Sequence, residues 1–369
     1  PRTAPLVRAQ TWRRWAGHQV ASAYDPHPER EYAAVRNAAA LFDVSPLYKY
    51  LIRGRDSARL LDRMVTRDVT NCAVGQVLYT PWCDAHGKVI DDGTVSRLDD
   101  ATYRLTSAEP NMRWLAMNAV GMDVTIEEVS ARTGALALQG PLSRTILQQL
   151  TPADIGKLKY FRLVQTTVRD VPVTISRTGY TGDLGYEIWV DAEQAVPLWD
   201  ALMACGEGFG ITPAGIWALD LARIEAGLVM LDVDYFSAHH ALIEDQKSFP
   251  DEINLAWTVN LEKGPYNGRR ALRKARALKQ AWAFVGIEVN WESLERLYAA
   301  RGLPPHLPNV AWRASAPVYR DGEQIGYATS GCWSPLLKRS LALAHIQAPH
   351  YEPGTRVQIE VTVEHHREQ

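Results

Sequence analysis

Short strand-like and helix-like segments alternate along most of the chain, and this alternation limits the possible folds more than any other feature. A first round runs from the strand pattern LYKYLIRG at residues 47–54 to strand, turn and helix patterns at residues 135–150. A second round begins with strands near residues 166–177 and ends with a helix pattern at residues 193–205. Both rounds have the same order without a βαβ rhythm, which predicts an α+β fold with two related subdomains.

The pattern changes after the basic segment GRRALRKARALK at residues 268–279. A charged run of this kind is usually the solvated face of a helix. Beyond it, short strands with Gly and Pro turns dominate, as in a small β-barrel. We therefore predict one module over residues 1–275, divided near residues 140–150, and a β-barrel domain over residues 280–369.

Composition excludes several classes of partner. Apolar residues make up 46% of the chain and charged residues 22%, and the net charge of -2 creates no field that would gather nucleic acid or an anionic membrane. No apolar run has the length of a membrane span, and the first residues lack the apolar core of a signal peptide. The four cysteines form no C-x-x-C pair, which is typical of reduced thiols. We expect a cytoplasmic protein with no nucleic acid or membrane partner.

A glycine-rich stretch, RTGYTGDLGYEIWV at residues 177–190, delivers one carboxylate, Glu187, to the start of an alternating strand. It lacks the G-x-G-x-x-G pattern and the lysine of a phosphate loop, and a strand rather than a helix follows it. Phosphate binding is therefore not expected. A lone glutamate after such a turn is usually a surface residue, but a second acidic site upstream favours a functional role.

That second site is the pair Asp91 and Asp92 within HGKVIDDGTVSRL. Neighbours on a strand face opposite sides, so only one of the two carboxylates can point into a given pocket. Burial of a carboxylate is costly without a partner, which favours a specific contact. A turn or bulge with two solvated acids remains the alternative.

Histidines and cysteines suggest no metal site. The pairs His239–His240 and His365–His366 are adjacent, and adjacent residues rarely bind one metal ion. Cys83 and His86 resemble a nucleophile and base, but no oxyanion-hole pattern accompanies them. A packed thiol and a loop histidine explain these two residues better.

Several separate motifs, in the right order, resemble the aminomethyltransferase family: the T-protein of the glycine cleavage system and its folate-dependent demethylase relatives. They are AVRNAAALFDVS (34–45), VLYTPWCDAHGKVIDDGTV (77–95), ALQGP (137–141), SRTGYTGDLGYEI (176–188), PAGIWALDLARIEAGL (213–228), KGPYNGRRAL (263–272) and TSGCWSPLLKRSLALA (329–344). The resemblance implies a folate-binding module of two ferredoxin-like subdomains followed by a β-barrel domain. It also implies the cofactor tetrahydrofolate.

The resemblance implies roles for individual residues. Glu187 falls on the glutamate that grips the pterin ring, whose edge presents an amino group and a ring N–H that one carboxylate can accept together. Asp92 falls on the catalytic acid, and Asp91 then faces away. Tyr79 and Tyr180 fall in the folate pocket.

The chain departs from the T-protein pattern around the donor side. Leu219 stands where the family has an arginine that contacts folate, Pro46 replaces a histidine, and His18 replaces a tryptophan. The segment at residues 231–257 is longer than its counterpart. We therefore predict a demethylase that moves a methyl group from a small O-, N- or S-methylated donor to tetrahydrofolate.

The group that protonates the departing donor stays open. Its candidates are Asp92, His18, Tyr24, His239 and His240. One alternative function is a glycine cleavage T-protein that receives an aminomethyl group from a lipoyl carrier protein. A lesser alternative is a non-catalytic folate-binding assembly factor for iron–sulfur enzymes, although Pro265 replaces the cysteine that defines that group.

Overall fold

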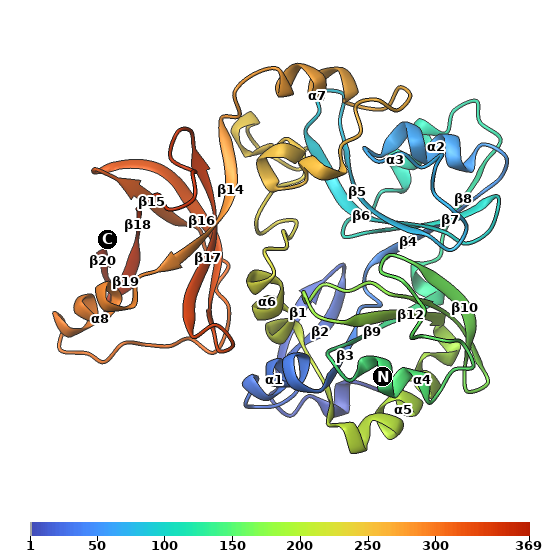
Figure 1. The fold of residues 1–369 in the computed structure, drawn as a ribbon, viewed down its shortest axis with the longest axis horizontal. Helices are drawn as coiled ribbons and strands as arrows, with labels where there is room; N and C mark the ends of the chain where they lie inside the picture. Colours follow the sequence, from blue (N-terminus) through green and yellow to red (C-terminus); the bar gives the residue numbers. More distant parts are fainter. Residues whose placement is uncertain (1) are drawn as a thin grey trace.

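Two sheets with helices on their outer sides form the N-terminal part of the computed structural model, which describes residues 2–369 (Figure 1). The first sheet has the strand order β5-β6-β7-β4-β8. Its strands are β4 (Tyr48–Arg53), β5 (Val77–Cys83), β6 (Val89–Arg97), β7 (Thr102–Ser107) and β8 (Thr125–Glu128). Helices α2 (Ser57–Met64) and α3 (Met112–Asn118) cover its outer face, where Leu60, Leu61 and Leu115 are fully buried.

The second sheet has the order β10-β11-β12-β9-β3-β13. Its strands are β3 (Ala39–Asp43), β9 (Thr133–Gln139), β10 (Leu163–Val168), β11 (Val171–Ser176), β12 (Gly185–Asp191) and β13 (Ile211–Pro213). Helices α4 (Ser143–Gln148) and α5 (Ala195–Gly206) cover its outer face through residues such as Ile146 and Leu198. Only β13 runs parallel to its neighbour, β3.

The inner faces of the two sheets share one hydrophobic cluster. It joins Cys83 and Val89 of the first sheet to Ala137 and Trp189 of the second. Helices α1 (Glu29–Asn37) and α6 (Ile216–Glu225) belong to the same cluster, and α6 also contacts the hairpin of β1 (Thr11–Trp15) and β2 (His18–Ala23). The inner faces therefore meet over a common core, and polar side chains on them lie between the sheets.

The C-terminal part is a third sheet, in the order β14-β17-β16-β15-β18. It comprises β14 (Trp282–Val289), β15 (Ala316–Arg320), β16 (Glu323–Ser334), β17 (Arg339–Gln347) and β18 (Gln358–Ile359), with helix α8 (Trp291–Ala299) and the hairpin β19 (Val361–Val363) and β20 (His366–Glu368). Arg313 donates to both carboxylate oxygens of Asp220 on α6, at 2.9 and 2.8 Å, which ties this part to the first two sheets.

The alternation predicted most elements of the two sheets, but it missed β3. Residues 30–40 have a helix-like pattern, but α1 ends at Asn37 and β3 starts at Ala39. Because β3 lies between two neighbouring strands and is covered on both faces, its sequence is a continuous apolar run that a helix pattern can absorb.

The chain passes from the first sheet to the second between β8 and β9, yet β3 belongs to the second sheet although it precedes the first. The two subdomains are therefore interleaved in sequence. The division near residues 140–150 and the outer limits of both domains stay predictions.

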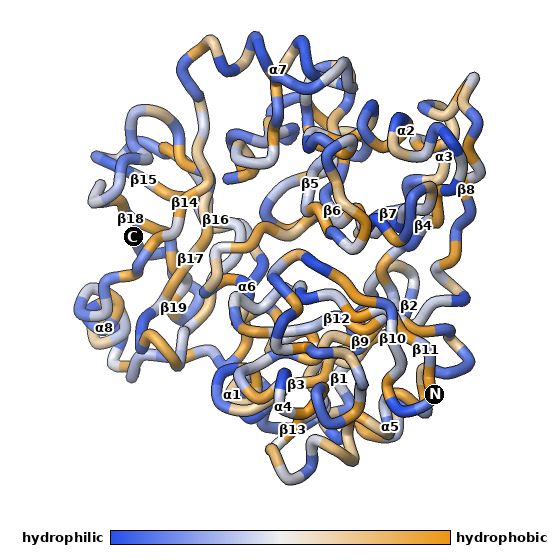
Figure 2. Tube along the Cα trace, turned by 45° about the vertical axis from the view of Figure 1, so that its right-hand side comes forward, coloured by the Kyte–Doolittle hydropathy of each residue, from blue (hydrophilic) through white to orange (hydrophobic). Residues whose placement is uncertain are grey.

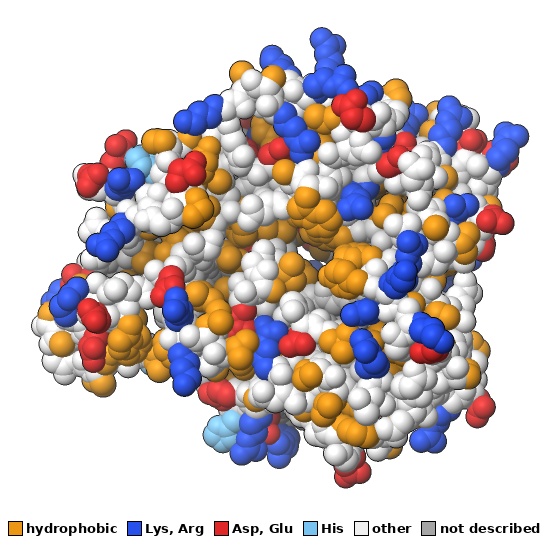
Figure 3. Space-filling view, in the orientation of Figure 1, with side chains coloured by type: hydrophobic (Ala, Val, Ile, Leu, Met, Phe, Trp, Pro, Cys, Tyr) orange, Lys and Arg blue, Asp and Glu red, His pale blue; other side chains and the backbone are white. Residues whose placement is uncertain are grey.

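Charges are spread over the surface. Figure 3 shows Lys and Arg side chains interspersed with Asp and Glu on one face, and a hollow near its centre. The basic helix α7 (Arg269–Arg276) is largely hydrophilic in Figure 2 and buries only Leu272, as a solvated helix face should. No helix within residues 2–369 is both long and apolar enough to span a membrane.

Candidate functional site

Asp92 lies on the inner face of the first sheet, on β6, and is half-buried. Its Oδ2 accepts a hydrogen bond of 2.7 Å from the Tyr79 hydroxyl, and its Oδ1 accepts one from the Tyr235 hydroxyl. Burial raises the pKa of Asp92, and the two phenols oppose that shift. The result is a carboxyl group of raised proton affinity in a fixed orientation.

Asp91 faces the other side of the sheet. Its carboxylate accepts hydrogen bonds from the backbone N–H groups of Asp92 and Glu109, at 2.8 and 3.1 Å, and from Asn111 Nδ2 at 2.9 Å. Asn111 in turn accepts from the indole of Trp82, which belongs to the outer core. Asp91 is fully buried, so its visible role is to hold the turn that follows β7.

Glu187 lies on the inner face of the second sheet, on β12, paired with Ala137 and Ser176. The Thr178 hydroxyl donates to its Oε2, while no residue of the described chain donates to Oε1. Burial raises the pKa of Glu187, and Thr178 and the charge of Arg104 oppose the rise. One oxygen of this carboxylate is therefore free to accept a hydrogen bond from a ligand.

The glycines of the turn before β12 make room for one side chain, Gln139. A Cβ on Gly179 would lie 2.0 Å from Gln139, and one on Gly185 would lie 2.2 Å from it. Gln139 uses this space to donate to the Thr178 carbonyl at 3.3 Å and to accept from Thr181 at 3.0 Å. The glycine-rich turn thus wraps around Gln139 and fixes the start of the strand that carries Glu187.

The two predicted tyrosines differ in what they contact. Tyr79 holds Asp92 and stacks on the ring of Trp257, with ring centroids 6.1 Å apart. Trp257 is 62% exposed, so this stack extends from Asp92 to the surface. Tyr180 instead donates to the backbone carbonyl of Val229 and packs against the central cluster.

The four residues predicted for the donor pocket are not brought together. Tyr24 is buried in a small cluster with Val7 and Ala21. His18 is exposed at the start of β2, with its Nδ1 2.9 Å from the Ala16 carbonyl.

His239 and His240 lie in the opposite half of the module, beside the first sheet. His239 packs edge-on against Trp114 of α3. Both histidines are exposed. A donor-protonating role for any of the four stays a prediction.

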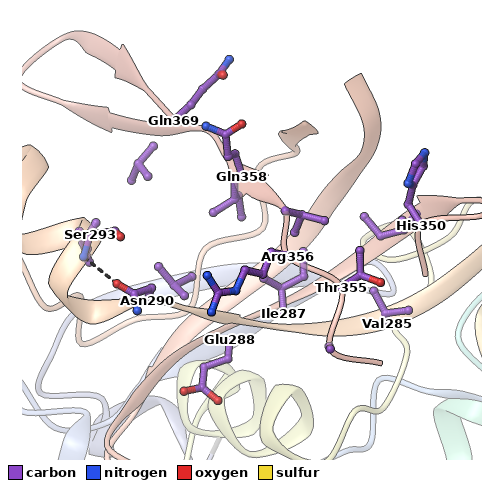
Figure 4. Close-up of a pocket in the computed structure, with 18 of the residues that line it drawn as sticks. Val285, Ile287, Glu288, Asn290, Ser293, His350, Thr355, Arg356, Gln358 and Gln369 are labelled. Carbon is purple, nitrogen blue, oxygen red and sulfur yellow. Dashed lines mark hydrogen bonds between the residues drawn. The ribbon is translucent and has the colours of Figure 1, made fainter. Parts of the chain in front are cut away.

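Asp92 and Glu187 line neither of two cavities found among the described residues. One of about 40 Å³ lies at Leu219, Tyr24, Trp12 and Trp15 and is far below the size of ordinary ligand pockets. The other, of about 1080 Å³, lies in the C-terminal part between β14, α8 and residues 350–361 (Figure 4). The candidate site is therefore defined by the side chains of Asp92 and Glu187 on the inner faces of the two sheets and not by a cavity.

Metal chemistry has no visible ligand set. Within residues 2–369, no group of three or more His, Cys, Asp or Glu side chains is placed to hold an ion. All four cysteines are free.

Several residues at the site were not predicted. Tyr235, Thr178, Trp189 and Arg104 all touch or flank the two carboxylates. Tyr235 comes from the long segment at residues 231–257, whose length was the only signal. Arg104 had a clearer signal, because it is the one charged residue within the strand TYRLTS.

Family models and relatives agree on the family. The models described as "GCVT N-terminal domain" and "Glycine cleavage T-protein C-terminal barrel domain" match residues 3–263 and 301–368. An aminomethyltransferase of Halothermothrix orenii is 33% identical over 335 residues, which cover 90% of this chain and 86% of that protein. One of Moorella thermoacetica is 35% identical over 335 residues, covering 90% and 84%. The chain belongs to the aminomethyltransferase family.

The fold agrees as well. The crystal structure of glycine cleavage system aminomethyltransferase T from Bartonella henselae matches with a TM-score of 0.82 at 22% identity, over 97% of this chain and 91% of that one. The predicted fold class is thereby confirmed, and tetrahydrofolate is the cofactor of this family. The relatives' names favour the alternative aminomethyltransferase function over the demethylase that the departures suggested.

Proposed function

We propose that this protein transfers a one-carbon group to tetrahydrofolate at a site between the first and second sheets. The observation that carries the proposal is the pair of carboxyl groups on facing sheets. No described residue donates a hydrogen bond to one oxygen of Glu187. This oxygen can therefore accept from the N–H groups of a pterin ring. Asp92 has both oxygens held by phenols and a raised pKa, as a residue that receives a proton at one defined place should.

Tetrahydrofolate, when bound, supplies the amine nitrogen that accepts the carbon. Asp92 takes up the proton of that nitrogen, and its raised pKa makes it a stronger base than an exposed aspartate. Tyr79 and Tyr235 hold the carboxylate in position, so no reorientation is needed during the transfer. General base catalysis of this kind contributes about 10²- to 10⁴-fold to the rate.

For the donor, we propose an aminomethyl group presented by a lipoyl carrier protein. The relatives named aminomethyltransferase, with 33 to 35% identity, support this choice. The hollow near the centre of the molecule (Figure 3) is compatible with a donor that enters on an arm.

A demethylase is the second candidate, and Leu219 favours it. Leu219 is buried on α6 and lines the small cavity with Trp12 and Trp15, where the resemblance placed an arginine. The hydroxyl of Tyr235, from the long segment at residues 231–257, donates a hydrogen bond to Asp92. Such changes beside a retained acceptor site are what a new donor requires.

One experiment separates the candidates. The purified protein and tetrahydrofolate are offered either an aminomethyl-loaded lipoyl carrier protein or a panel of methylated amines, sulfonium compounds and aryl methyl ethers. Ammonia and methylene-tetrahydrofolate from the carrier protein support the first candidate. Methyl-tetrahydrofolate with a demethylated product supports the second. Folate binding without turnover on either donor contradicts both and favours the assembly factor.

A further inference from the structure

Arg104 has a buried guanidinium for which the described residues supply neither a hydrogen bond nor an ion pair. It lies on β7 between Tyr103 and Leu105, which point into the outer core, so its own side chain points to the inner face. Only 4% of the residue is exposed. Its Nε and Nη2 atoms are buried and have no hydrogen-bond partner, and no residue of the described chain forms an ion pair with it. An unpartnered buried arginine is rare, because the lost hydration is not replaced.

The neighbourhood of Arg104 fixes it against the second sheet. Its Cζ lies 4.0 Å from the ring centroid of Trp189, two residues beyond Glu187 on the same face of β12. Glu187 is the acid whose charge acts on Arg104, although no hydrogen bond joins them. Burial nevertheless lowers the pKa of Arg104 to about 9.

Lys49 is a second buried cation on the same sheet face, and its ammonium group has hydrogen-bond partners. Its Nζ donates to the carbonyls of Ser45 and Leu47, at 2.6 and 2.7 Å. Both cations are buried on neighbouring strands, yet only Lys49 has its donors used. Buried cations on this face of the sheet do not generally lack hydrogen-bond partners. The N–H groups of Arg104 lack them because of the particular residues around Arg104.

The register places Arg104 at the Glu187 end of the site. Arg104 pairs with Ser96, four residues beyond Asp92 on β6, which corresponds to roughly 13 Å along the strand. Glu187 and Arg104 thus sit at one end of the inner space and Asp92 toward the other. A flat ring bound to Glu187 would present its adjacent atoms to Arg104.

We infer that Arg104 is a binding residue for tetrahydrofolate, whose Nε–H and Nη2–H groups donate to the carbonyl oxygen of the pterin ring. That oxygen neighbours the ring N–H and amino group for which Glu187 has a free acceptor. Arg104 then donates to the carbonyl oxygen of the pterin, and Glu187 accepts from the ring N–H and the amino group on the same edge of the ring. This inference rests on the proposed function and adds a determinant of which pteridines the site accepts.

The test uses two ligands that differ at C4 and at the neighbouring ring nitrogen. Tetrahydrofolate carries a carbonyl oxygen at C4 and a hydrogen on that nitrogen, whereas tetrahydroaminopterin carries an amino group at C4 and no hydrogen on the nitrogen. Calorimetry under anaerobic conditions compares them on the wild type and on Arg104→Met. A charge-assisted contact predicts that Arg104→Met weakens tetrahydrofolate binding about 10- to 100-fold but weakens binding of the amino analogue far less, so that the preference for tetrahydrofolate narrows to the share that Glu187 supplies. Arg104→Lys should recover only part of the affinity, because it lacks the planar fork.

The controls keep the outcomes distinct. Arg53→Met, an exposed arginine of the same sheet, should change neither affinity. The melting temperature of ligand-free Arg104→Met should equal or exceed that of the wild type, whereas Lys49→Met should lower it. Equal loss for both ligands, or no loss for either, overturns the role of Arg104. Failure of the wild type to bind tetrahydrofolate overturns the proposed function itself.

Discussion

The first and second sheets each present one carboxyl group to the space between them, but they hold it differently. On the first sheet, both oxygens of Asp92 accept from tyrosine hydroxyls. On the second sheet, the Thr178 hydroxyl donates to one oxygen of Glu187, and no residue of the described chain donates to the other. Both carboxyl groups have a raised pKa, because burial dominates at each.

This difference separates positioning from recognition. A carboxylate that is held at both oxygens has little freedom, which suits transfer of one proton at one place. A carboxylate with an open oxygen suits a ligand that brings its own donors. The two residues should therefore fail in different ways when they are changed.

The largest effect is expected for Asp92→Asn. An amide cannot accept the transferred proton, so the turnover number should fall about 10²- to 10⁴-fold while tetrahydrofolate affinity changes little. Steady-state kinetics and calorimetry measure the two quantities separately. The matched variant Asp91→Asn replaces one of the two oxygens that together accept from three N–H groups, and it should lower stability more than turnover. The reverse order of activity loss would contradict the assignment of the two faces.

Glu187→Gln should produce the opposite pattern. The amide presents one acceptor where the carboxylate presents two, so tetrahydrofolate binding should weaken by about 1.5–3 kcal/mol. Turnover at saturating tetrahydrofolate should change less. Glu193→Gln, on the exposed segment after β12, is the control. Unchanged affinity in Glu187→Gln would remove this residue from the pterin site.

A smaller effect, on stability, tests how the second sheet positions its carboxylate. In Gly185→Ala the new Cβ meets the side chain of Gln139, so we expect a loss of about 1–3 kcal/mol in the free energy of unfolding. Gly208→Ala is the control, since its Cβ would meet nothing within 4 Å. Urea denaturation measures both, and the double variant with Gln139→Ala should recover part of the loss. No difference between Gly185→Ala and Gly208→Ala would mean that the turn tolerates the clash.

Sequence patterns predicted the parts of this site that local spacing controls. Period-two alternation located β12 and put Glu187 on a strand, and the strand-like run around Asp91 and Asp92 located β6. The fold class followed from the order of segments and from the family resemblance. In contrast, β3 is apolar on both faces, so no period marks it.

The remaining site residues depend on contacts between distant segments. Tyr235 reaches Asp92 from 143 positions away, and Arg104 meets Trp189 across two sheets. No local pattern encodes such distances. The same reason explains why His18 and His239, proposed together for the donor, lie in different halves of the module.

The smallest effect is expected for Tyr235→Phe, which tests whether the phenols tune Asp92 or only pack beside it. The Tyr235 hydrogen bond lowers the pKa of Asp92, so its loss should raise that pKa further. Because the carboxylate is the base in the proposed mechanism, we expect activity above this pKa and its loss as the pH falls through it. The acid limb of the rate profile should therefore move to higher pH, with turnover above it reduced about 3- to 10-fold. Tyr160→Phe, an exposed tyrosine, should leave the profile unchanged. A reduced rate with an unmoved acid limb would assign Tyr235 to packing alone.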